Sequence, residues 1–527
     1  MGRILAVAFV MLAVSSAPSV AIDPAGSPWL EIENAKCAGL AFKDFSSETG
    51  TQTEIRSAAL VAAGADPVSK DLPAYCRVTA NIAPKNNVEI RLPITSWSGR
   101  VLMAGCGGLC GKIQMERTDD ALIRGYAVAH TDMGHAGTDM AFTADPQQFE
   151  DFVHRSTHVA TVLLKAVTAL YYDRNPERAY FRGCSTGGRQ GLTAALLYPD
   201  DYDGIVASAP AAGYGAVPNI AWAVRSNLRS DGTVILDVDA IKKLHRAVLN
   251  ACDMDDGLAD GIVADPDGCK FDPASMVCSG NSQDDCLTRE QVEAANRIYD
   301  GIPPDGRVYA SRGFMRGGEL GWVGRLAAAD GKPGDLIGVT RNYLARFGDL
   351  PNPPASILDL DMATVAPRLT EIDELPSFGA DGRAMAKFND AGGKFLFLHA
   401  WADNSLTPAT AIDVYNRNRA AFGGELDSFM RLFIVPGVYH CGGGPGPDAT
   451  DTLTAIEDWV ENDTPPVRLM AYHTVQRMPY PRKNQFPLAK DSFDAARPLF
   501  PFPDFGRYSG TGDPRDAENW ARVSSGD

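Results

Sequence analysis

Short apolar runs alternate with a helical pattern in the first half of the chain. Runs typical of buried strands occur at Val101–Ala104, Tyr126–His130 and Ala179–Phe181. Between the last two, Gln148–Tyr172 carries apolar residues at helical spacing. Strand, helix and strand in this order predict a sheet that is at least partly parallel. Val88–Ile94 instead alternates apolar and polar positions, which favours a half-buried edge or antiparallel strand.

The same pattern continues beyond residue 185 and is then interrupted. Gly191–Tyr198 has the character of a helix that ends before a proline, and Gly204–Ala209 has that of the next buried strand. Similar strand-like runs return only at Lys394–Ala400 and Met430–Val435. We therefore predict an α/β fold with a mostly parallel sheet, formed by residues 22–212 and 393–527.

Residues 213–392 differ from the parts on either side. They contain four cysteines, several Asp-rich and Gly/Pro-rich turns, and amphipathic helical fragments at Asp237–Leu249 and Thr288–Tyr299. Their content of aromatic and aliphatic residues is too high for a disordered linker. We interpret this segment as a large inserted domain.

Residues 1–21 have the pattern of a secretory signal peptide. Arg3 supplies a positive charge, Ile4–Val14 is apolar, and a small-x-small sequence ends at Ala21. The apolar run is too short to span a membrane, and an N-terminal core helix is the alternative. A cleaved signal predicts a protein that is secreted or periplasmic.

Charge and cysteine content limit the partners and the compartment. The net charge of −17 would repel nucleic acid and anionic lipid, and Lys and Arg are scattered along the chain. We therefore expect no nucleic-acid and no membrane partner. The ten cysteines are even in number and lack the C-x-x-C spacing of a zinc ribbon, so disulfides in an oxidising compartment are favoured.

Ser185 has the sequence context of a catalytic nucleophile. It lies in Gly183–Gly187, after a predicted buried strand and before a helix rich in Ala and Leu. A sharp strand-to-helix turn of this kind exposes a serine above the sheet, and the helix N-terminus favours a developing oxyanion. A structural Gly-rich turn is the alternative.

A serine nucleophile needs a histidine base and a carboxylate that orients it. In this type of strand-turn-helix site the chain order is Ser, acid, His, so the base lies beyond residue 185. His440 follows the strand-like run that ends at Val435, whereas His399 lies inside an apolar strand and is better read as a core histidine. Asp403 is the first carboxylate after Lys394–Ala400, with a surface-turn aspartate as the alternative. The other histidines beyond the serine are His245 and His473.

An acyl-transfer site also needs two N–H donors for the oxyanion. We expect one from Thr186, directly after the nucleophile, and the other from the Gly-rich loop after Val101–Ala104, where we choose Gly108. Cys106 and Cys110 lie on either side of Gly108 and form either a local disulfide or a pair of thiols.

Cysteines adjoin both catalytic candidates. If Ser185 Oγ and His440 Nε2 lie within hydrogen-bond distance, their neighbours Cys184 and Cys441 come close enough for a disulfide. Two buried thiols are the alternative.

Taken together, these motifs resemble those of the tannase and feruloyl esterase family, which includes hydrolases of mono(2-hydroxyethyl) terephthalate. The resemblance is carried by Cys184-Ser185, Asp403 and His440-Cys441, and by the stretches RGCSTGGRQ (182–190), YAVAHTDMG (126–134) and GCGGLCG (105–111). It implies an α/β-hydrolase core with a large inserted lid domain, and activity on small esters of aromatic acids. It also suggests the disulfides Cys37–Cys76 and Cys278–Cys286.

An acidic stretch in the insertion, residues 252–262, suits a calcium ion. Several carboxylates and two glycines occur there, and Ca²⁺ prefers oxygen ligands, including backbone carbonyls. The stretch lacks the helix-loop-helix frame and terminal Glu of an EF-hand. The resemblance implies a structural site, bracketed by a Cys252–Cys269 disulfide. An acidic solvated turn is the alternative. The implied ligands are the side chains of Asp253, Asp256 and Asp260 and the carbonyls of Leu258 and Ile262.

The sequence thus predicts a serine ester hydrolase, with hydroxycinnamate esters such as feruloyl esters as first substrate, galloyl esters second and terephthalate monoesters third. Candidate lid contacts to substrate are Trp322, Arg341, Tyr343 and Phe347. A peptidase on the same scaffold and a catalytically silent, calcium-stabilised binding protein are the rival hypotheses. His130 and His135 are interpreted as part of a structural loop in which Asp132 bonds to nearby backbone.

Overall fold

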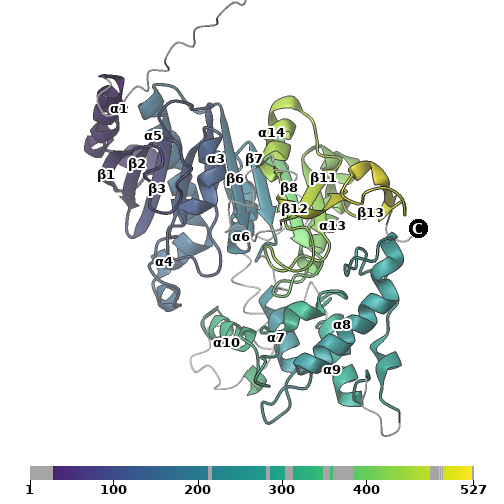
Figure 1. Cartoon of the computed structure of the whole chain (residues 1–527). Coiled ribbons are helices and arrows are strands. Elements are labelled where there is room, and N and C mark those ends of the chain that lie inside the picture. Colours follow the sequence, from purple (N-terminus) through teal and green to yellow (C-terminus); the bar gives the residue numbers. More distant parts are fainter. Residues whose placement is uncertain are drawn as a thin grey trace, which may run out of the picture.

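A nine-stranded mixed sheet forms the centre of the molecule (Figure 1). The structure is a computed structural model that describes residues 28–211, 216–279, 285–302, 312–347, 357–359, 385–474, 486, 488 and 491–524. The strand order is β1-β2-β3-β5-β4-β6-β7-β8-β9. The first four strands in this order pair antiparallel, and those from β5 to β9 pair parallel. The strands are β1 Thr53–Val61, β2 Tyr75–Ile82, β3 Asn86–Pro93, β4 Arg100–Ala104, β5 Ala127–Thr131, β6 Arg178–Cys184, β7 Gly204–Ser208, β8 Lys394–Ala400 and β9 Met430–Val435.

The predicted α/β fold is therefore present, and helices cover both faces of the sheet. Alternate residues of β6 point to opposite layers, with Phe181 in the core beneath α5 and α6 and Tyr180 in the core beneath α3 and α14. This alternation follows from the two-residue period of a strand. The helices of the core are α1 Pro28–Gly39, α2 Ser46–Thr49, α3 Asp119–Ile123, α4 Pro146–Glu150, α5 Ser156–Tyr172, α6 Thr186–Leu197, α12 Ala386–Asp390, α13 Ala409–Phe422 and α14 Thr452–Asn462.

Two predicted helices differ from the observed ones. The expected helix at 148–172 is divided into α4, one turn of π-helix at Asp151–Arg155 and α5. The carbonyls of Phe152 and Val153 in the π-turn accept hydrogen bonds from the Arg189 guanidinium. The helix expected from Gly191 begins instead at Thr186. Its first turn contains two glycines that are required by close packing, Gly187 against the loop after β4 and Gly188 against Ser208 and Pro210 at the end of β7.

The segment between β7 and β8 is helical in its described part and has its own apolar cluster. It contains α7 Ala216–Ser226, α8 Val238–Cys252, α9 Arg289–Asp300 and α10 Leu336–Phe347, which group together below the sheet in Figure 1. Leu244, Ile298 and Trp322 belong to this cluster, which also includes Cys106 and Phe152 from the loops of the core. The insertion therefore packs on those loops.

The C-terminal part adds strands that the pattern along the chain did not predict. β10 Ala449–Thr450, β11 Leu469–Thr474 and β12 Phe493–Leu499 form a small antiparallel sheet, and β13 Asp504–Tyr508 pairs with β14 Trp520–Ser524. Among the helices in the described ranges, none is long and apolar enough to cross a bilayer. The predicted signal peptide, residues 1–21, lies outside the described residues.

Candidate active site

Ser185 occupies a strained turn between β6 and α6. Its backbone has φ 63° and ψ −121°, a conformation that residues with a side chain rarely adopt. Its N–H donates to the Ser208 carbonyl at 3.0 Å, which ties the turn to the end of β7. A Cβ on Gly183 would lie only 2.6 Å from the backbone of Gly187, so glycine is required where the strand and helix cross. The sequence therefore forms the elbow that the motif predicts.

His440 connects the serine to a buried carboxylate. Its Nε2 lies 2.9 Å from Ser185 Oγ, and its Nδ1 lies 2.8 Å from Asp403 Oδ2. The other oxygen, Asp403 Oδ1, accepts from the N–H groups of Ser405 at 2.8 Å and Leu406 at 2.7 Å. An Nδ1–H that donates to Asp403 leaves Nε2 free to accept the serine proton. The three predicted residues thus lie in one hydrogen-bonded line.

The environment of Asp403 keeps it ionised. Burial by itself would raise the pKa of Asp403, but the charge and hydrogen bond of His440 and the N–H of Leu406 together lower it below the ordinary value. His399 lies beneath it, only 2 % exposed, and burial lowers the pKa of this imidazole. A buried, neutral His399 agrees with its interpretation as a core histidine.

A disulfide joins the serine turn to the histidine turn. Cys184 and Cys441 are bonded, with their Cα atoms 6.1 Å apart and a sequence separation of 257. Cys441 has φ 61°, so the residue after His440 is held in the left-handed region. The bridge therefore restrains both the turn that carries Ser185 and the turn that carries His440.

The remaining cysteines are also paired in the structure. Cys37–Cys76 joins α1 to β2, Cys252–Cys269 encloses the acidic loop, and Cys278–Cys286 closes a short loop in the insertion. The two alternatives at Cys106 and Cys110 are resolved in favour of a local disulfide.

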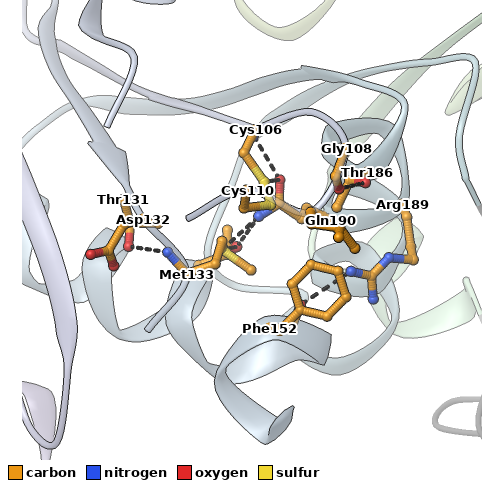
Figure 2. Close-up of a disulfide and its surroundings, with 12 residues drawn as sticks. Cys106, Gly108, Cys110, Thr131, Asp132, Met133, Phe152, Thr186, Arg189 and Gln190 are labelled. Atoms are coloured by element: carbon orange, nitrogen blue, oxygen red, sulfur yellow. Dashed lines mark hydrogen bonds between the residues drawn. A yellow bond between two sulfur atoms is a disulfide. The ribbon is translucent and has the colours of Figure 1, made fainter. Parts of the chain in front are cut away.

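The Gly-rich loop after β4 lies directly against the start of α6 (Figure 2). The Thr186 hydroxyl donates to the Gly108 carbonyl at 2.6 Å, and Gly108 has φ +60°. Thr186 is the first residue of α6, where backbone N–H groups have no partner within the helix. Thr186 and Gly108 are thus neighbours at the serine, and their roles as oxyanion donors stay predictions.

Asp132 and His135 lie in a structural loop as expected, whereas His130 belongs to strand β5 just before it. Asp132 Oδ1 accepts from the N–H groups of Asn87 and Gly134, both at 3.0 Å. Nε2 of His135 lies 2.7 Å from the Leu109 carbonyl. His130 is fully buried, and burial together with Arg117 lowers its pKa to about 3.

The acidic loop of the insertion meets an arginine from β12. Arg497 contacts Asp256 Oδ2 and Asp260 Oδ2, both at 2.8 Å, and Asp253 Oδ1 accepts three backbone N–H bonds. Burial raises the pKa of Asp256 to about 6 despite Arg497, with further upward contributions from Asp260 and Asp253. Across the described ranges, no three His, Cys, Asp or Glu side chains converge as a ready metal site. The carboxylates of Asp253, Asp256 and Asp260 nevertheless have the charge and the oxygen ligands that suit a hard cation.

The insertion contacts the loop that carries Asp403. The Asn404 side-chain amide donates to the Gly321 carbonyl at 2.8 Å, and its oxygen accepts from the His440 N–H at 3.4 Å. Arg325 donates to Ser405 Oγ at 2.5 Å. Sequence reasoning missed Asn404, although its position directly after the predicted acid was the available signal.

The structure places the four candidate substrate contacts in different environments. Trp322 is 1 % exposed and packs against Tyr299 and Phe314, so its prediction as a wall of the substrate site is wrong. Its ring fills the core of the insertion instead. Arg341 is exposed on α10. Tyr343 and Phe347 lie on the same helix, but their side chains are outside the described part.

A cavity of about 100 Å³ lies beside the Cys184–Cys441 bridge. Its walls come from the ends of β6 to β9, from residues of the segment 438–450 and from Thr452 at the start of α14. Ser185 and His440 do not line it, so an ester carbonyl attacked by the serine would lie elsewhere.

Comparison with known proteins identifies one family. Residues 72–523 match the family model described as tannase and feruloyl esterase. The chain is 30 % identical to mono(2-hydroxyethyl) terephthalate hydrolase of Piscinibacter sakaiensis, over 87 % of this chain and 86 % of that protein. It is 29 % identical to feruloyl esterase B of Aspergillus niger, over 97 % of this chain and 98 % of that protein.

Solved structures share the fold. Feruloyl esterase B from Aspergillus oryzae superimposes with a TM-score of 0.79 at 24 % identity, covering 93 % of this chain and all of that one. Tannin acyl hydrolase from Aspergillus niger gives a TM-score of 0.69 at 21 % identity, covering 90 % of both chains.

Proposed function

Because the chain belongs to the tannase and feruloyl esterase family and is a carboxylic ester hydrolase, we propose that it cleaves esters of aromatic acids, feruloyl-type esters first, through an acyl-enzyme on Ser185. The observation that carries the mechanism is the unbroken contact from Ser185 Oγ through His440 to Asp403.

In this mechanism Ser185 Oγ attacks the ester carbonyl while His440 Nε2 takes the hydroxyl proton. Asp403 orients the ring and stabilises the imidazolium. The N–H groups of Thr186 and Gly108 hold the negative oxygen of the tetrahedral intermediate. His440 then returns the proton to the leaving alcohol, and a water attacks the acyl-enzyme by the same relay.

The insertion serves as a lid in this proposal and is the region that selects the substrate. Its contacts with Asn404 and Ser405 support this role because they place it beside the acid and the base. The curated relatives are named for feruloyl esters and for a terephthalate ester, whose shared feature is an aromatic acid. Galloyl esters and terephthalate monoesters are the second and third candidates.

The test compares kcat/KM for methyl ferulate, methyl gallate, chlorogenic acid, mono(2-hydroxyethyl) terephthalate and a peptide anilide. Ser185→Ala should abolish ester hydrolysis while Ser57→Ala, a matched change on the exposed edge strand β1, leaves it unchanged. Wild-type activity in Ser185→Ala would exclude Ser185 as the nucleophile. Cleavage of the anilide alone would favour the peptidase, and cleavage of no ester would favour the binding protein.

Calcium in the acidic loop is part of the proposal as a structural ion. Asp253, Asp256 and Asp260 would hold it with the carbonyls of Leu258 and Ile262, and its charge would offset that of the carboxylates. Dialysis against EDTA should lower the melting temperature, and Ca²⁺ should restore it in wild type but not in Asp260→Asn. An unchanged melting temperature would instead identify an acidic turn neutralised by Arg497.

Secretion is the last part of the proposal. Five disulfides support an oxidising compartment. N-terminal sequencing of the exported protein should begin at Ile22. A mature protein that retains Met1 would contradict the signal peptide.

A further inference from the structure

The Gly-rich loop, residues 105–111, is held to α6 by two side chains four residues apart. The Thr186 hydroxyl donates to the Gly108 carbonyl at 2.6 Å, and Gln190 Oε1 accepts from the Cys106 N–H at 3.0 Å. Residues at positions i and i+4 of a helix lie on the same face. One face of α6 therefore contacts the loop at two backbone groups, on either side of Gly107 (Figure 2).

The orientation of the Gln190 amide is fixed by its partners. A backbone N–H can only donate, so the atom that faces Cys106 must be the oxygen. The amide nitrogen then lies 3.0 Å from Thr157 Oγ1 and 2.8 Å from Met133 Sδ. Gln190 is 3 % exposed, so loss of its oxygen would leave the Cys106 N–H buried without an acceptor.

The loop and α6 are also in backbone contact. A Cβ on Gly187 would lie 2.8 Å from the Cys106 carbonyl, and one on Gly105 would lie 2.6 Å from Gly187 Cα. This spacing leaves no room for the loop to slide toward the helix. The Cys106–Cys110 bridge closes the loop from within, and its Leu109 carbonyl contacts His135.

We propose that Gln190 is a positioning residue that holds the Gly-rich loop in register with the serine turn. The inference rests on the proposed function, in which this loop supplies an oxyanion donor. Ser185 is the N-cap residue of α6 and Thr186 is its first residue, so Gln190 binds the loop to the same helix that carries the nucleophile and one expected donor. A donor displaced by about 1 Å loses much of its effect on the transition state.

The test separates positioning from simple packing. Gln190→Met keeps the length of the side chain and removes the acceptor. Gln190→Glu retains an oxygen for the Cys106 N–H whether or not it is ionised. Leu192→Val is the matched control, because Leu192 is buried on the same helix but belongs to the apolar cluster beneath α5, whereas Cys106 and Cys110 of the loop belong to another cluster.

Gln190→Met should lower kcat on p-nitrophenyl acetate about 10- to 100-fold with KM nearly unchanged, since removal of a whole oxyanion donor costs about 10²- to 10³-fold. Its affinity for an aryl trifluoromethyl ketone, whose adduct carries an oxyanion, should fall by the same factor. Gln190→Glu should recover most of both losses. Leu192→Val should lower the melting temperature and leave kcat and ketone affinity unchanged.

Two results would overturn the proposal. One is a Gln190→Met enzyme with wild-type kcat, and the other is a loss of kcat without loss of ketone affinity. Either result with Ser185→Ala inactive would contradict only the role of Gln190. An active Ser185→Ala enzyme would contradict the proposed nucleophile itself.

Discussion

Removal of the Cys184–Cys441 bridge tests whether this disulfide serves catalysis or only stability. The perturbation is the double variant Cys184→Ala/Cys441→Ala, and the control is Cys37→Ala/Cys76→Ala. The control bridge joins α1 to β2, at the edge of the sheet away from β6. Both variants remove two buried or partly buried sulfur atoms and leave alanine methyl groups.

The loop lengths predict similar losses of stability. In the chain-entropy model, a bridge across 257 residues contributes about 5.6 kcal/mol and one across 39 residues about 3.9 kcal/mol, as upper values. The difference of about 1.7 kcal/mol is small for a more than sixfold change in loop length, because the entropy grows only with the logarithm of that length. Stability alone therefore does not distinguish the two bridges, which makes the second a suitable control for the first.

Activity should distinguish them. Cys441 is held at φ 61° directly after His440, and freeing it allows the ring to leave its position 2.9 Å from Ser185 Oγ. Displacement of about 1 Å at a reacting group costs about 100-fold in rate. We expect kcat at 20 °C to fall by about that factor in the first variant and to stay near wild type in the control, with melting curves measured alongside. Equal kcat values in the two variants would refute a catalytic role for the bridge.

Two further predictions concern pH and the contact between insertion and core. His130 is buried with its pKa lowered to about 3. Between about pH 3 and pH 6.5 its imidazole is therefore protonated in the unfolded chain and neutral in the folded protein, so its burial costs no stability above about pH 6.5. Below that pH, His130 should lower the free energy of unfolding by about 1.4 kcal/mol per pH unit. In urea titrations at pH 6.5, 5.5 and 4.5, His130→Gln should show a smaller decrease with falling pH than wild type. An equal decrease in both proteins would contradict a neutral, buried His130. Gly321→Ala would place a Cβ 2.9 Å from Asn404 Cβ and 3.0 Å from Tyr439 Cε1, and should raise KM for methyl ferulate more than for p-nitrophenyl acetate. Gly338→Ala, with no atom within 4 Å, is its control, and equal effects on both esters would show that the contact does not affect substrate choice.

The parts of the fold predicted from sequence are those with strong local signals. Each of the buried runs near residues 101, 126, 179, 204, 394 and 430 became a strand of the parallel part of the sheet. Burial on both faces makes such strands almost continuously apolar, so their pattern is distinct. The start of α6 was misplaced for the opposite reason. Gly187 and Gly188 are poor helix formers, and only their contacts with Cys106 and Pro210 explain their presence there.

The residues that support the site were harder to find than those predicted to react. Ser185, Asp403 and His440 each follow a recognisable strand, and chain order limited the choice. Gln190 and Asn404 lie next to predicted site motifs, but their residue type gives no role, because an amide at a helix or loop position is compatible with an exposed surface. Their roles depend on backbone groups of residues 106 and 321, which the fold alone brings near.

The two supporting amides act on different parts of the proposed reaction centre. Gln190 holds the loop of the expected oxyanion donor, and Asn404 bonds both to the His440 N–H and to the insertion. Stabilisation of the oxyanion is needed for every ester, whereas the insertion would distinguish one ester from another. Loss of Gln190 should therefore reduce kcat by the same factor for all substrates in the panel, while Asn404→Ala should change their relative kcat/KM values. If loss of Gln190 changed the relative kcat/KM values and Asn404→Ala lowered kcat equally for all esters, substrate choice would depend on the core and not on the insertion.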